Sequence, residues 1–199
     1  VFNDTLRGFL NTTMDMIECP DELLAALETC TKIQVRGIKN TFARQPFVKN
    51  VVFFIHNGFD MFMSREQFQT FYWPGLKACV DAVIECGGTP QIYIEDKYDS
   101  KMDIIVNDLP ANKCILTLIN CDVEKWKGAC QGKIALAGGV DGTLLEFGTP
   151  EQVVKNVKDT LDLWAPGGGY LLNCDVSLDK AKPENLHALY DTAKNYQQR

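Results

Sequence analysis

The sequence CILTLINCDV, residues 114–123, decides the fold, because an unbroken apolar run ends abruptly in an amide, a thiol and a carboxylate. Residues 169–176, GYLLNCDV, repeat this arrangement. Continuous short apolar runs are typical of strands that are buried on both faces, as in parallel sheets. Both copies of NCDV therefore fall at the predicted ends of strands.

Three further apolar runs predict strands of the same kind: VVFFI (51–55), QIYI (91–94) and KIALA (133–137). Helical patterns lie between the runs. Ser64 and Gln67 have the spacing of a capping box, and Thr149 and Gln152 repeat it around a proline at the first helical position. Pro74 predicts a kink in the first of these helices, or the start of a second one.

The alternation of strand and helix predicts an α/β fold with a parallel sheet and right-handed crossovers. No GxGxxG motif follows the first strand, which weakens the case for a dinucleotide-binding sheet. A complete (β/α)₈ TIM barrel has eight strands, and the sequence predicts about five. We therefore expect either a small open doubly wound sheet or the C-terminal portion of a barrel. Residues 1–50 form a helical lead-in, and residues 51–199 form the (β/α) units of a single domain.

Composition narrows the possible partners. The chain is 46% apolar and 23% charged, which is typical of a globular protein. Its net charge of −6 is spread without a basic stripe, so we expect no nucleic-acid partner and no binding to an acidic membrane surface. No apolar run is long enough to span a membrane. The eight cysteines include no CxxC pair and are predicted to be reduced, and the protein is predicted to be cytoplasmic.

Polar residues gather at the predicted carboxyl ends of the strands, where ligands bind in both architectures. They are His56, Asn57, Glu95, Asn120, Cys121, Asp122, Gly139, Asn173, Cys174 and Asp175. An imidazole, a carboxylate and a thiolate from separate strands can hold a catalytic zinc ion with one open position. Structural roles are equally open: buried thiols for the cysteines, a helix cap for Asp122, a hydrogen-bonded histidine, and a glycine that merely avoids crowding.

One glycine-rich segment lies elsewhere. PGGGY (166–170) precedes a strand instead of following one, which places it at the opposite end of the sheet. Its position favours a helix stop and a tight turn over a phosphate cradle.

Longer segments resemble a known family. Residues 148–189, GTPEQVVKNVKDTLDLWAPGGGYLLNCDVSLDKAKPENLHAL, look like the C-terminal signature of the uroporphyrinogen decarboxylase superfamily. Residues 4–24 and 62–94 resemble its members too, most closely the branch allied to corrinoid-dependent methyltransferases. The resemblance implies a (β/α)₈ barrel, of which this chain is expected to be the C-terminal portion.

The same resemblance implies an activity and its site. A methyl group would move between a corrinoid-binding partner protein, which carries the methylcorrinoid, and a small methyl acceptor, either tetrahydrofolate or a thiol. Zinc methyltransferases of the superfamily have a His-x-Cys pair after one strand and a cysteine after the last. Cys174 matches the last cysteine, while Glu95 and Lys97 stand in for the pair, so His56 or Cys121 is needed to complete a metal site.

These considerations assign provisional roles. The expected catalytic residues are Glu95, Cys174 and Asp175. The expected metal ligands are Glu95, Cys174, His56 and Cys121. The expected substrate-binding residues are His56, Asn57, Asn120, Asp122, Asn173 and Gly139.

Two alternatives remain. Decarboxylation of uroporphyrinogen III, a step of porphyrin and heme biosynthesis, predicts arginines at the mouth of the barrel. Arg7 and Arg65 are the nearest candidates. The other alternative is an inactive fragment whose open sheet edge pairs with a second copy to give a homodimer.

Overall fold

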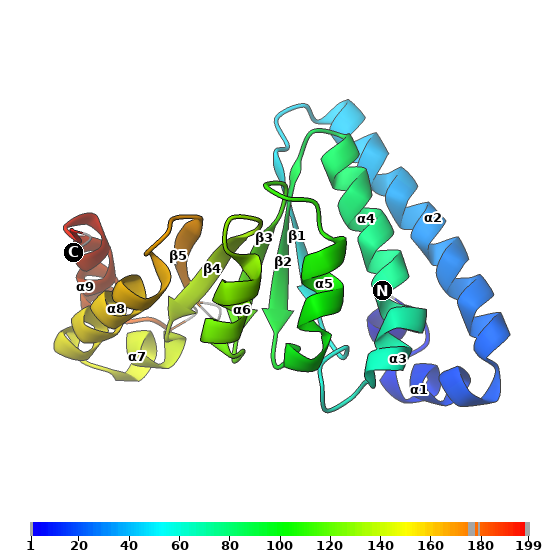
Figure 1. The fold of residues 1–199 in the computed structure, drawn as a ribbon, viewed down its shortest axis with the longest axis horizontal. Helices are drawn as coiled ribbons and strands as arrows, with labels where there is room; N and C mark the ends of the chain where they lie inside the picture. Colours follow the sequence, from blue (N-terminus) through cyan, green and yellow to red (C-terminus); the bar gives the residue numbers. More distant parts are fainter. Residues whose placement is uncertain (1, 175–177, 179, 198–199) are drawn as a thin grey trace.

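The computed structural model describes residues 2–174, 178 and 180–197. Its centre is one sheet of five parallel strands in the order β1-β2-β3-β4-β5 (Figure 1). The strands are β1 (Asn50–Ile55), β2 (Thr89–Glu95), β3 (Ile115–Ile119), β4 (Ala135–Val140) and β5 (Tyr170–Cys174). A doubly wound sheet reverses its strand order at a switch point, whereas a barrel adds each strand beside the last. The order therefore confirms part of a TIM-barrel-like fold and rules out the doubly wound alternative.

Helices precede the sheet and connect its strands. The elements before β1 are η1 (Phe2–Leu6, a π-helical turn), α1 (Phe9–Glu18) and α2 (Pro20–Arg44). Those that follow are α3 (Arg65–Gln67), the π-helical turn η2 (Phe68–Tyr72), α4 (Trp73–Glu85), the 3-10 turn η3 (Asp99–Lys101), α5 (Met102–Asp108), α6 (Val123–Cys130), α7 (Gly142–Phe147), α8 (Pro150–Trp164) and α9 (Pro183–Lys194). Before β1 the described chain is mostly helical, and α2 lies along α4 (Figure 1).

The predicted helix signals are confirmed. The Ser64 hydroxyl accepts a hydrogen bond from the Gln67 backbone N–H, and the Gln67 side chain accepts one from the Ser64 N–H, at 3.1 and 3.0 Å. Thr149 and Gln152 form the same reciprocal pair at the start of α8. Pro74 stands in the first turn of α4, so the segment divides there into a short helix and a longer one.

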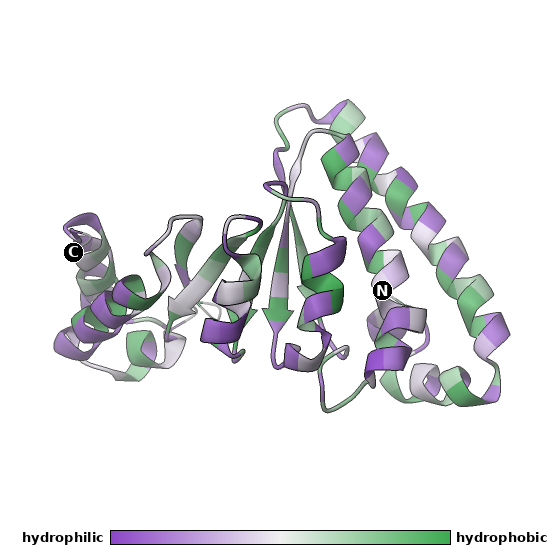
Figure 2. Ribbon diagram, viewed as in Figure 1, coloured by the Kyte–Doolittle hydropathy of each residue, from purple (hydrophilic) through white to green (hydrophobic). Residues whose placement is uncertain are grey.

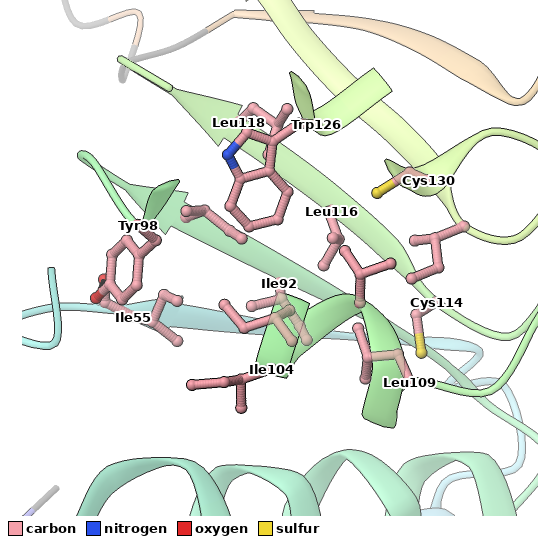
Figure 3. Close-up of a cluster of buried hydrophobic side chains, with 14 of the residues drawn as sticks. Ile55, Ile92, Tyr98, Ile104, Leu109, Cys114, Leu116, Leu118, Trp126 and Cys130 are labelled. Atoms are coloured by element: carbon pink, nitrogen blue, oxygen red, sulfur yellow. Dashed lines mark hydrogen bonds between the residues drawn. The ribbon is translucent and has the colours of Figure 1, made fainter. Parts of the chain in front are cut away.

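The helix-facing side of the sheet forms the main core. Its side chains include Ile92, Leu116 and Leu118, which are almost completely buried. Figure 3 shows them packed with Ile104 and Trp126 from α5 and α6. The strands are largely hydrophobic, while the helices have one hydrophobic and one hydrophilic side (Figure 2). Burial of the apolar side of each helix against the strands therefore fixes how the sheet is covered.

The other side of the sheet is open and concave. Asn173 of β5 donates a hydrogen bond of 2.9 Å from Nδ2 to the Tyr93 hydroxyl of β2. These strands are three positions apart, a separation of about 14 Å in a flat sheet. The two side chains meet only because the sheet curls. On this open face Val52, Phe54 and Leu171 remain 42%, 56% and 45% exposed.

The strand boundaries differ from the predicted runs by up to three residues, and the carboxyl ends of β4 and β5 bear on the site. β4 runs to Val140 and not to residue 137, so Gly139 lies inside the strand. β5 likewise extends through Asn173 and Cys174. Because side chains alternate along a strand, these last two residues face opposite sides of the sheet. Among the helices that the structure describes, none combines the length and apolar character that a membrane span requires.

Candidate functional site

The carboxyl ends of the five strands meet along one rim, because all the strands are parallel and adjacent strands pair in register. Ile55 of β1 pairs with Ile94 of β2, which places His56 beside Glu95. Gly139 of β4 pairs with Asn173 of β5 at the other end of the rim. The candidate residues of β1, β2 and β5 thus share one edge of the molecule.

His56 and Glu95 form the central contact of the rim. Nδ1 of the imidazole lies within ion-pair distance of Oε2 of the carboxylate. The His56 side chain is 49% exposed and that of Glu95 27%, so a small molecule can reach both. With Nδ1–H donated to the carboxylate, Nε2 carries the lone pair of a neutral imidazole and can accept a proton. Orientation of a histidine by a carboxylate is a common arrangement for a general base.

The backbone around this pair is unusual. Asn57, Asp96 and Asn120 have φ values of 56°, 133° and 58°, in regions that residues other than glycine rarely adopt. Two side-chain hydrogen bonds involve all three residues: Asn120 Nδ2 donates to Asp96 Oδ1 at 3.0 Å, and Asn57 Nδ2 donates to Asp4 Oδ1 at 3.1 Å. Strained backbone of this kind concentrates at functional sites, where the surrounding contacts offset its energetic cost.

Below the rim, the open face offers aromatic surface. The rings of Phe54 and Tyr93 are 5.0 Å apart between centroids, and the Tyr93 hydroxyl accepts the hydrogen bond from Asn173. Glu95 lies two residues beyond Tyr93 on the same face of β2. The site therefore has an apolar floor and a polar rim, an arrangement typical of small-molecule binding sites.

The chain is similar to known proteins in sequence and in structure. The sequence model described as uroporphyrinogen decarboxylase (URO-D) matches residues 2–196. The chain belongs to the URO-D family. Its structure is similar to that of a methyltransferase from Methanosarcina mazei, with a TM-score of 0.75 and 15% sequence identity. The match covers 94% of this chain but only 53% of that chain. No curated protein matches the sequence significantly.

The structural likeness concerns the fold. Its five strands correspond to part of the URO-D fold, and the chain spans about half the length of the methyltransferase it resembles.

The zinc site expected from the URO-D resemblance is not assembled. Among the residues that the structure describes, no three His, Cys, Asp or Glu side chains gather closely enough to hold a metal ion. Glu95 and His56 meet, but Cys174 packs beside the core cluster of α7, α8 and α9, on the helix-facing side of the sheet. The four proposed ligands therefore do not fit a zinc ion as they lie. Asp175 falls outside the described residues.

Cys121 lies near the rim but is directed inward. Its thiol contacts the backbone carbonyls of Asp96 and Ile119 at 3.2 and 3.4 Å. Burial raises the pKa of this thiol to about 12. It is therefore a neutral hydrogen-bond donor near pH 7 in this arrangement.

Structural roles account for two predicted substrate-binding residues. Asp122 caps α6, where its carboxylate accepts a hydrogen bond from the Lys125 N–H and pairs with the Lys125 ammonium, and the side-chain contact lowers its pKa. Gly139 has a φ of 91°, and a Cβ there would stand 2.5 Å from the Thr160 methyl carbon. Close packing of α8 on β4 thus requires a glycine at this position.

The arginines also bear on function within the URO-D family. Arg7 forms two hydrogen bonds with the Asp15 carboxylate, at 2.7 and 2.9 Å. Arg65 pairs with Asp103 and donates to the Ser100 carbonyl. Both of these arginines are therefore already engaged by other groups of the chain.

Tyr93 and Asp4 were missed by sequence reasoning, and Asp96 was noted after its strand but given no role. Alternation along β2 gave a usable signal for Tyr93, since it shares a face with Glu95. Asp96 stood in the strand-end sequence without a distinguishing feature. No sequence pattern connects Asp4 with Asn57, which lies 53 positions later.

Thiol reactivity tests the burial of three cysteines of the core. Burial raises the pKa values of Cys114, Cys121 and Cys130 to about 11, 12 and 11. Since the thiolate is the reactive form, we expect these three to react with iodoacetamide at pH 8 more than about tenfold slower in the native protein than in urea. Mass spectrometry of peptides gives each rate. Native labelling of Cys121 as fast as in urea would contradict its placement.

Proposed function

We propose that this URO-D family member is part of a methyltransferase that moves a methyl group between a corrinoid-binding protein and a small acceptor, tetrahydrofolate or a thiol. The observation that carries the proposal is the accessible His56–Glu95 pair at the rim of the open face. Family membership and the fold shared with a methyltransferase support it.

The proposed chemistry uses the chain's own residues for proton transfer. A thiol acceptor is a poor nucleophile until it loses its proton, and an N–H acceptor, which attacks through its lone pair, must lose its proton as the nitrogen is methylated. In our proposal, His56 Nε2 takes the proton while the acceptor's lone pair forms the new bond to the methyl carbon. The electron pair of the broken donor bond stays with the donor. Glu95 keeps the imidazole oriented and stabilises the imidazolium that forms.

The rest of the site positions the acceptor. Phe54 and Tyr93 provide an apolar surface that excludes water from one side. Asn120 and Asp96 offer an amide and a carboxylate at the rim for polar groups of the acceptor. In-line transfer depends on such positioning, since a misplacement of about 1 Å can lower a rate a hundredfold. Reduced acceptors and eight thiols suit the cytoplasm, where we place the protein as part of this proposal.

Decarboxylation of uroporphyrinogen is the second candidate, favoured by the family description. It needs cationic groups for the substrate's carboxylates. Arg7 and Arg65 are held by Asp15 and Asp103, which is why methyl transfer is the preferred proposal.

Self-association is the third candidate. β1 and β5 are the outer strands of the sheet, and apolar side chains of both are exposed on the open face. Unpaired edge strands favour pairing with another chain. Gel filtration with light scattering measures it: a dimer supports pairing between copies, and a monomer at about 100 μM opposes it.

A direct assay separates the two activities. The purified protein is mixed with methylcobalamin and either tetrahydrofolate or 2-mercaptoethanesulfonate, and loss of the methylcobalamin absorbance is followed. We expect acceptor-dependent demethylation above the rate without protein, and the methylated acceptor by mass spectrometry. Conversion of uroporphyrinogen III in a parallel reaction, with no demethylation, would overturn the proposal in favour of decarboxylation.

A further inference from the structure

The end of the sheet opposite the rim contains a cavity of about 410 Å³. It lies where β3, β4 and β5 begin, between the chain around residues 112–114, the turn at 130–135 that leads into β4, and the glycine turn at 166–169. None of its lining residues belongs to the proposed methyl-transfer site. Its chemistry therefore needs a separate explanation.

The cavity is positively charged in an acidic protein. Lys113, Lys127 and Lys133 line it, and no Asp or Glu does. The whole chain has 26 acidic and 20 basic residues, so a lining with three lysines and no carboxylate is opposite in sign to the molecule. Three lysines around one partly enclosed space, with no carboxylate among the lining residues, attract anions.

Two of these lysines are held in place. Lys127 Nζ donates to the Leu163 carbonyl near the end of α8 at 2.6 Å, and Lys133 Nζ donates to the Val106 carbonyl near the end of α5. An ammonium group has three donors, so these contacts fix the cations and leave donors for a ligand. Lys113 makes no hydrogen bond or ion pair with any residue in the described part of the chain. It is available to close on an anion.

The glycine turn gives the wall its shape. Gly167, Gly168 and Gly169 have φ values of 93°, 75° and 69°, all in the region that favours glycine. One such residue is enough to end a helix. A Cβ at Gly168 or Gly169 would meet nothing within 4 Å, so packing does not explain these two glycines. Their effect is an exposed backbone that a ligand can approach closely.

The inner wall is aromatic. The Trp164 and Tyr170 rings are 5.3 Å apart between centroids, and the Tyr170 hydroxyl is used in a 2.7 Å hydrogen bond to the Gly138 carbonyl. Trp164 is only 6% exposed, so the half-buried Tyr170 ring, backed by Trp164, offers most of the aromatic carbon surface to the cavity. A matching ligand has an anionic group for the lysines and a flat apolar body for the rings.

We propose that this cavity is a binding site for a small organic phosphate with an aromatic or similarly flat body. A phosphate monoester presents three oxygens, and lysine binds phosphate as a point charge. The site does not depend on the proposed methyl transfer. β4 runs from the cavity at Ala135 to the rim at Val140, so one strand joins the two regions.

Calorimetry on the whole chain tests the proposal with phenyl phosphate, inorganic phosphate and phenol as probes. We expect phenyl phosphate to bind one to one, inorganic phosphate to bind about tenfold more weakly, and phenol not to bind. Lys113→Met should lower the affinity for phenyl phosphate about tenfold, which is the effect of losing one charge-assisted hydrogen bond. Lys127→Met should do the same, and Lys158→Met, on the exposed side of α8, is the matched control.

The variants and probes distinguish a phosphate site from other kinds of binding. Lys113 is exposed, so its replacement should leave the fold intact, which circular dichroism checks, and a result with this variant does not depend on the helix contact of Lys127. If Lys158→Met lowers the affinity for phenyl phosphate as much as Lys113→Met does, the binding is diffuse charge attraction. If phenol binds as tightly as phenyl phosphate, the cavity is only an apolar crevice. Either result, or no saturable binding of phenyl phosphate at about 10 mM, overturns the proposal.

Discussion

Replacing His56 with glutamine is expected to lower the rate of methyl transfer by roughly two to four orders of magnitude, the contribution typical of a general base. Glutamine retains hydrogen-bonding capacity and approximate size but cannot take a proton near pH 7. Glu95→Gln should also slow the reaction, because the imidazolium loses its counter-charge and Nδ1 its oriented acceptor. The methylcobalamin assay with each variant measures both effects.

The dependence on pH distinguishes a base from a structural histidine. A simple thiol acceptor ionises near about pH 8.5, and above that pH it no longer needs a base. The deficit of His56→Gln should therefore shrink between pH 6.5 and pH 10 with a thiol acceptor. Glu28→Gln, which removes an exposed carboxylate from an ion pair on α2, is the control and should leave the rate unchanged. A deficit that stays constant across this range would rule out His56 as the base.

Local sequence signals predicted the elements of this fold, because their causes are local. A capping box needs only Ser64 and Gln67 in neighbouring turns, and the apolar run VVFFI forms β1 even though Val52 and Phe54 stay exposed on the open face. The predicted β4 began too early because Lys133 and Ile134 belong to the turn after α6, where the Ile134 N–H bonds to the Cys130 carbonyl. It ended too early because glycines at positive φ do not resemble a strand in sequence.

The site depended on long-range pairing and was less predictable. Residues that directly follow parallel strands were predicted to lie together, and His56 and Glu95 do so because their strands share a rim. It could not show which side chains face each other. Cys174 was placed in the site by position, yet alternation along β5 directs it to the helix-facing side while Asn173 reaches Tyr93, 80 residues away.

A buried ion pair holds the two loops that carry the rim. Lys101 is fully buried, with Nζ 2.8 Å from Asp60 Oδ1 and 5.9 and 5.8 Å from the ring centroids of Phe68 and Tyr98. Asp60 follows His56 in the β1–α3 loop, and Lys101 follows Glu95 after β2. Burial raises the pKa of Asp60, but hydrogen bonds from Lys101 and Ser100 outweigh it and hold the pKa below its usual value.

Asp60→Ala is expected to lower the free energy of unfolding by about 3–5 kcal/mol, because it leaves an ammonium group buried without a counter-charge. That is a large part of the roughly 5–15 kcal/mol typical of a domain. Lys101→Met should cost less, since the Asp60 side chain is 27% exposed and can turn toward water. The double variant should recover part of the loss. Urea unfolding at pH 7 measures all three.

Acid provides an independent check of the same pair. Because the folded-state pKa of Asp60 is lowered, its contribution to stability is present above the unfolded-state pKa of about 4 and is lost as the pH falls through the folded value. The stability difference between the parent protein and Asp60→Ala should therefore narrow below about pH 4. The exposed pair Arg65–Asp103 joins α3 to α5 without burial, so Asp103→Ala is the matched control and should cost far less. Equal losses from Asp60→Ala and Asp103→Ala would show that the burial of Lys101, and with it the rigid support of the rim, is not as the structure describes.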